Sequence, residues 1–211
     1  MGGNAARTAV KRALARFRSR RVGPGVTILT YHRVHGGSPD ELDLAPAEFA
    51  AQADVLAETD VVSLDEAVRR LSNDDPSACV VLTFDDGFAD VYDNAWPLLK
   101  ERGLPFALFL ATRYVGGRMR WEGSTAKSDG PALSWPQIEE MLASGLCTIG
   151  NHTHSHVPPS ALTVEELDSC SDVIEARLGV RPRHFAYPWG VPVTELEDEL
   201  RRRFDSAATG A

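Results

Sequence analysis

The chain has 211 residues, of which 43% are hydrophobic and 25% charged, as in ordinary globular domains. At this length one domain is expected, and no apolar run approaches the ~18–20 residues of a membrane span. The three cysteines, Cys79, Cys147 and Cys170, lie far apart. This excludes a disulfide framework or a cysteine-based zinc module and predicts small buried hydrophobic residues.

The charge is unevenly distributed. Residues 1–39 hold eight Lys or Arg and no acid, so the remaining 172 residues hold 14 basic and 30 acidic groups. We therefore divide the chain into a basic N-terminal helical arm, residues 1–24, and a main domain, residues 25–211. The arm either lies on an anionic membrane or packs on the main domain. The acidity of the main domain argues against an enzyme that acts on nucleic acid. No apolar core of a secretion signal follows the basic residues, which predicts a cytoplasmic protein. Peripheral contact with a membrane through the basic arm is one interpretation of these residues.

Short apolar runs alternate with helical patterns along the main domain. We expect strands at 26–31, 61–64, 79–84, 106–111, 147–150, 184–187 and 204–208. We expect helices at 46–58, 64–71, 90–102, 135–144, 163–178 and 193–203. Residues 116–132, rich in Gly and polar residues, read as an irregular loop.

This alternation predicts an α/β fold with a parallel sheet covered by helices. Seven strands fit a closed, rather small β/α barrel, and an open doubly wound sheet is the alternative. In both folds ligands bind at the carboxyl ends of the strands.

Two expected strand ends carry residues typical of a metal site. Asp85 and Asp86 follow the run 79–84, and His152 and His156 follow the run 147–150 with a spacing of four. Two imidazoles and one carboxylate form a three-ligand site with an open position, as in catalytic zinc centres. The alternatives are that Asp86 caps a helix and that the histidines lie in a solvated turn.

Three motifs together carry a family resemblance: TFDDG at 83–87, HTHSH at 152–156 and FAYPWG at 185–190. From about residue 27 to 208 the chain resembles the polysaccharide deacetylase family, the NodB-homology domain of carbohydrate esterase family 4. The resemblance implies a distorted (β/α)7-type barrel, with parallel strands and helices outside. It also implies a catalytic role for residues 25–211, as a metal-dependent N-deacetylase of N-acetylated sugars.

The resemblance also implies roles for individual residues. Asp86, His152 and His156 would hold a divalent metal ion, most often Zn2+, and Asp85 would be the general base. The groove wall would consist of Tyr187, Pro188 and Trp189. Trp189 would offer an apolar face to a sugar ring.

The chain departs from the common family pattern in two ways. Ala186 stands where many members have an Arg that holds the catalytic Asp, and no His follows His184 to act as general acid. The poly-N-acetylglucosamine deacetylase branch resembles the chain in both respects, and it has an early Tyr-His motif. We therefore predict His32 as the general acid. His154 and His184 are the alternatives, as is a His32 that merely packs at the barrel mouth.

The sequence thus predicts a hydrolase that removes N-acetyl groups from N-acetylhexosamine units of a glycan or glycan precursor and releases acetate. Two other functions stay open: a catalytically impaired glycan-binding protein on the same barrel, and a metal-dependent amidase of a non-sugar substrate. Trp121 and Trp135 either border the groove or pack in the core. Asp90 and Asp93 are expected on a solvated helix face.

Overall fold

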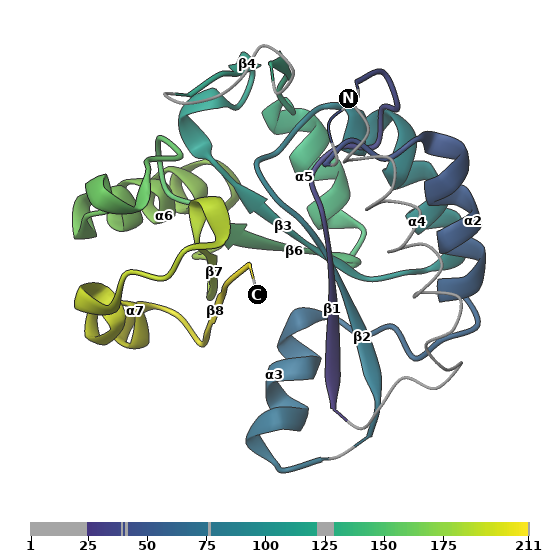
Figure 1. Cartoon of the computed structure of the whole chain (residues 1–211), viewed down its shortest axis with the longest axis horizontal. Helices are drawn as coiled ribbons and strands as arrows, with labels where there is room; N and C mark the ends of the chain where they lie inside the picture. Colours follow the sequence, from purple (N-terminus) through teal and green to yellow (C-terminus); the bar gives the residue numbers. More distant parts are fainter. Residues whose placement is uncertain (1–24, 39, 41, 76, 122–128, 211) are drawn as a thin grey trace, which may run out of the picture.

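The computed structural model describes residues 25–38, 40, 42–75, 77–121 and 129–210, so the predicted arm 1–24 lies outside the described residues. Six parallel strands form one sheet in the order β1-β2-β3-β6-β7-β8, which curls into a half-barrel (Figure 1). The strands are β1 (Val26–Tyr31), β2 (Cys79–Phe84), β3 (Phe106–Leu110), β6 (Cys147–Asn151), β7 (His184–Ala186) and β8 (Ser206–Ala208). Within the described ranges the outer strands β1 and β8 do not pair with each other.

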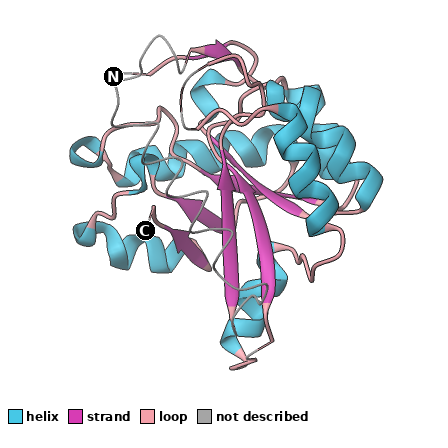
Figure 2. Cartoon of the chain, turned by 45° about the vertical axis from the view of Figure 1, so that its right-hand side comes forward, coloured by secondary structure: helices cyan, strands magenta, loops and turns pink. Residues whose placement is uncertain are grey.

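Helices surround this sheet (Figure 2). They are α2 (Pro46–Leu56), α3 (Leu64–Ser72), α4 (Trp96–Arg102), α5 (Trp135–Ala143), α6 (Val164–Leu178) and α7 (Glu197–Arg203). Helices α2, α4 and α5 lie on one side of the half-barrel, and α6 and α7 lie beside β7 and β8 (Figure 1). Within the residues that the structure describes, no helix combines the length and apolarity needed to cross a bilayer.

Short elements complete the connections. Strands β4 (Arg118–Met119) and β5 (Gly130–Pro131) pair antiparallel inside the predicted loop 116–132. A π-helical turn, η1 (Val91–Ala95), precedes α4. The single helical turns are η2 (Thr112–Tyr114), η3 (Pro159–Ala161), η4 (Pro188–Gly190) and η5 (Thr194–Leu196).

The predicted α/β fold, a distorted barrel with parallel strands and external helices, is confirmed, with six strands in place of seven. The segment 61–64 is not a strand, because Val61 makes only an isolated bridge to Val80. This bridge occupies the first half of the β2 edge, whereas β3 pairs with the second half of the same edge, at Thr83 and Phe84. The segment has no further strand edge to extend along.

The core lies between the sheet and its helices. Every residue of β2 and β3 is buried, as expected for near-continuous apolar runs in a parallel sheet. Tyr31, Phe49 and Phe106 pack around Phe84 with ring centroids 5.2–5.9 Å apart. All three cysteines are buried and free, as predicted.

Helix α3 packs at the amino-terminal end of the half-barrel. Its residues Leu64 and Ala67 join Val81, Phe109 and Ala186 in one apolar cluster. Figure 1 shows α3 near the amino-terminal ends of β1 and β2. The carboxyl ends of the strands are thereby left as the accessible end of the barrel.

Candidate active site

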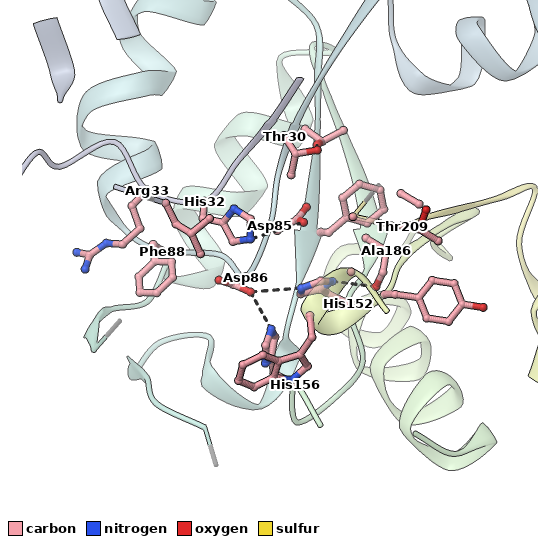
Figure 3. A pocket seen from close by; sticks show the side chains of 18 of the residues that line it. Thr30, His32, Arg33, Asp85, Asp86, Phe88, His152, His156, Ala186 and Thr209 are labelled. Carbon is pink, nitrogen blue, oxygen red and sulfur yellow. Dashed lines mark hydrogen bonds and ion pairs between the residues drawn. The ribbon is translucent and has the colours of Figure 1, made fainter. Parts of the chain in front are cut away.

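The carboxyl ends of the strands surround a cavity of about 1000 Å³ (Figure 3). The cavity also extends along both outer strands, since Ile28 of β1 and Ala208 of β8 contribute to its wall. The sequence-predicted residues that line it are His32, Asp85, Asp86, His152, His156, Tyr187 and Trp189. Pro188, predicted for the groove wall, is buried in η4 between the last two.

Asp86, His152 and His156 converge on one point. The Nε2 atoms of His152 and His156 lie 3.3 Å and 3.1 Å from Asp86 Oδ1 (Figure 3). One ligand atom from each residue falls within 4.8 Å of the others, and all three residues are buried. Among the described residues, Asp86 Oδ1 nevertheless has no hydrogen-bond partner with suitable geometry. Three buried ligand atoms that approach one another without hydrogen bonding fit a cation, and this donor set is one that zinc accepts.

Neighbouring groups orient His152. Its Nδ1 lies 2.9 Å from the carbonyl oxygen of Ala186, so Nδ1–H donates a hydrogen bond to that oxygen. The unprotonated Nε2 then directs its lone pair towards Asp86. The preceding Asn151 donates two hydrogen bonds to α6 residues and accepts one from the backbone N–H of Thr153. Asn151 therefore anchors the start of the His152–His156 turn to the helix behind it.

The backbone is strained around this cluster. Five described non-glycine residues have a positive φ, and four of them lie at the site: Asp86, Thr153, His156 and Trp189. Each such conformation costs on the order of 1 kcal/mol and persists only where the surroundings enforce it. The positions of these side chains are therefore held by the fold.

Asp85 lies beside the cluster, with its side chain 13% exposed and its Oδ2 4.0 Å from His32 Nε2. Burial raises the pKa of Asp85 above its ordinary value, and its Oδ1 has no hydrogen-bond partner in the described ranges. Burial acts the same way on Asp86, but His152 and His156 outweigh it and hold the pKa of that carboxyl below its usual range. Two adjacent buried carboxylates are costly unless a cation is near, which also fits a metal ion at Asp86.

Arg181 and Arg183 lie shortly before Ala186 in the chain, but within the described residues neither pairs with Asp85. Arg181 pairs with acidic residues of α6, and Arg183 pairs with Asp205. The charged groups that act on the Asp85 carboxyl are His152, His32, Asp86 and His156. Asp85 is thus flanked by three histidines and by Asp86.

The other histidines considered as general acid lie elsewhere. His154 Nδ1 is 2.9 Å from Thr112 Oγ1, and buried His184 lies between Ser206 and Asp65. Among the described residues, His32 is the histidine outside the Asp86 cluster that lines the cavity.

Two features at or near the cavity were wrongly predicted or left open by the sequence. Asp90 is buried against Arg33 and does not lie on a solvated helix face, so that prediction is wrong, whereas Asp93 is exposed. Trp121 lines the cavity with its ring centroid 4.0 Å from that of His156. Trp135 instead packs against the main core cluster.

Comparison with known proteins extends this picture. A family model described as polysaccharide deacetylase matches residues 72–202. YxkH of Bacillus subtilis is 31% identical over 67% of this chain and 47% of its own length. The poly-beta-1,6-N-acetyl-D-glucosamine N-deacetylase of Staphylococcus epidermidis is 30% identical over 55% of this chain and 42% of its own length. The chain thus spans less than half of these relatives.

Solved structures show the same fold. IcaB from Ammonifex degensii superposes with a TM-score of 0.74 and 33% identity, covering 86% of this chain and 82% of that one. The deacetylase PplD of Streptococcus pyogenes, solved with acetate, gives a TM-score of 0.69 and 26% identity over 87% and 82%.

Proposed function

Because the chain belongs to the polysaccharide deacetylase family, we propose that it is a metal-dependent hydrolase that removes N-acetyl groups from N-acetylhexosamine units of a glycan and releases acetate. The observation that carries this proposal is the convergence of Asp86, His152 and His156 beside Asp85 on one cavity wall. The activity named for the Staphylococcus epidermidis relative supports poly-N-acetylglucosamine as the substrate class.

Asp86, His152 and His156 would hold the ion, for which zinc fits the ligand set. A divalent ion there would supply a Lewis acid able to polarise the acetamide carbonyl and to lower the pKa of nearby water. Asp85, which is not part of the three-ligand cluster, takes the proton of the attacking water as general base.

The departing amine needs a proton, because an amide anion is a poor leaving group. His32 lies on the same cavity wall, with its Nε2 4.0 Å from Asp85 Oδ2, and serves as the general acid. Tyr187 and Trp189 form the groove wall for the glycan, and Pro188 supports the turn between them. Trp189 is 48% exposed and offers its ring to a sugar face.

The test is acetate release from β-1,6-linked N-acetylglucosamine oligomers, with protein stripped of metal and then reloaded with zinc. We expect the activity to disappear on stripping and to return with zinc. Full activity in the stripped protein would contradict the metal dependence. Binding of the oligomer to folded, zinc-loaded protein without acetate release would favour the non-catalytic glycan-binding function.

A further inference from the structure

Trp121 occupies an unusual place in the cavity wall. It follows β4, and its ring is packed against His156 at a centroid distance of 4.0 Å and an interplanar angle of 36°. Phe88 and Tyr114 contact it from two other segments, with centroids 6.2 Å and 6.1 Å away. The ring is therefore held in place beside a predicted metal ligand and still lines the cavity.

The indole Nε1 of Trp121 is buried and has no hydrogen-bond partner within the part of the chain that the structure describes. A buried N–H without an acceptor destabilises a fold by about 1–3 kcal/mol, so native structures usually supply a partner. The cluster against which Trp121 packs consists of the apolar residues Phe88, Ala111, Met119 and Ala132. Trp121 also lines the cavity, so a ligand bound there would lie against this side chain.

A second tryptophan reaches the same histidine. Trp189 of η4 lies with its ring centroid 5.6 Å from that of His156. Trp121 and Trp189 thus come from separate loops and both line the cavity next to the metal cluster. Aromatic rings suit the apolar face of a pyranose, whereas a fixed N–H donor suits one of its hydroxyl or ring oxygens.

We propose that Trp121 is a substrate-binding residue that, together with Trp189, holds the sugar ring of an N-acetylhexosamine unit at the metal cluster. Its Nε1–H donates a hydrogen bond to an oxygen of that sugar. The proposal rests on the proposed function for the identity of the sugar. It adds to the groove wall a residue outside the three sequence motifs, in the loop between β4 and β5.

The test compares Trp121→Phe, which keeps an aromatic ring but removes the N–H, with Trp121→Ala, which removes both. Acetate release from β-1,6-linked N-acetylglucosamine tetramer gives KM and kcat. Loss of one ground-state hydrogen bond should raise KM about two- to tenfold in Trp121→Phe and change kcat little. Trp121→Ala should raise KM further. Trp135→Phe, the same change at a tryptophan of the core cluster, should leave both constants unchanged.

Zinc content and tetramer binding distinguish a direct sugar contact from an indirect effect through His156. Both Trp121 variants should keep the zinc content of the wild type, and loss of zinc would overturn the proposal by showing that Trp121 acts through His156. Unchanged KM in both variants would also overturn it. Calorimetric binding of the tetramer to the zinc-loaded protein tests the contact without turnover. If the wild type releases no acetate while the variants bind the tetramer more weakly, the proposed reaction fails and the binding role stands.

Discussion

Arg33, the residue that follows His32, forms a buried ion pair with Asp90. Arg33 Nη2 and Nε each lie 2.9 Å from Asp90 Oδ2, and Asp90 Oδ1 accepts from the backbone N–H of Val34 at 2.9 Å. The pair connects the loop that leaves β1 with the turn that follows β2. These are the two segments that carry His32 and Asp85, so the pair holds together the backbone from which both side chains project.

Replacing Asp90 with Ala should therefore weaken the fold. Arg33 would lose the carboxylate it faces in a nearly buried position, which we expect to lower the free energy of unfolding by about 3 kcal/mol. Chemical denaturation measures the change. Asp93→Ala, an exposed position of the adjacent η1, is the matched control and should shift stability by less than about 0.5 kcal/mol. Equal shifts in both variants would show that the ion pair does not stabilise the fold.

Local sequence patterns predicted which candidate residues gather at the cavity better than they predicted the contacts around them. Asp85, Asp86, His152 and His156 follow apolar runs, and parallel strands bring their carboxyl ends together. The predicted solvent exposure of Asp90 was wrong. The helix begins with the π-helical turn η1, which breaks the 3.6-residue period that assigns residues to helix faces.

Two further features depend on tertiary structure. The apolar run at 61–64 has the composition of a strand, but whether it pairs depends on how much of the β2 edge β3 leaves available. The contact between Trp121 and His156 depends on the path of a Gly-rich loop. Neither the pairing nor this path has a periodic signal in the sequence.

Asp85 and Asp86 are adjacent, yet we expect their Asn variants to lose activity for different reasons. Asp85→Asn should lower kcat by about 10²–10⁴-fold while the zinc content stays unchanged, because only the base is lost. Asp86→Asn should lose zinc affinity, because the amide replaces a charged ligand. Acetate release and metal analysis measure the two effects. Full activity of Asp85→Asn would contradict its assignment as the base.

His32→Ala tests the general acid through the leaving group. Hydrolysis of the N-acetyl amide should fall by about 10²–10⁴-fold, since the amine must be protonated as it departs. An aryl acetate ester, whose phenolate leaves without a proton, should be hydrolysed at a rate within about tenfold of the wild type. His35→Ala, an exposed position three residues away, is the control and should retain both activities. Equal losses on amide and ester would indicate that His32 acts on positioning or folding instead.

His184 gives the fold a pH dependence separate from the reaction. It is fully buried, with Nδ1 2.9 Å from Ser206 Oγ and Nε2 3.2 Å from Asp65 Oδ1, and Arg183 and Asp205 are the other charged groups nearby. Burial lowers the pKa of His184 below its ordinary value. The unfolded chain therefore binds a proton at a higher pH than the folded protein does.

The sign of the effect follows from this difference. The contribution of His184 to stability is complete above pH ~6.5, the pKa of an exposed histidine, and is lost as the pH falls towards the lower folded-state value. We expect the free energy of unfolding of zinc-free protein to fall between pH 7.5 and 5.5, by at most about 1.4 kcal/mol per pH unit from this group. His184→Gln should show a smaller slope than the wild type, whereas His35→Gln should keep the wild-type slope. Denaturation curves across this range measure the difference, and identical slopes in His184→Gln and the wild type would rule out His184 as the titrating group.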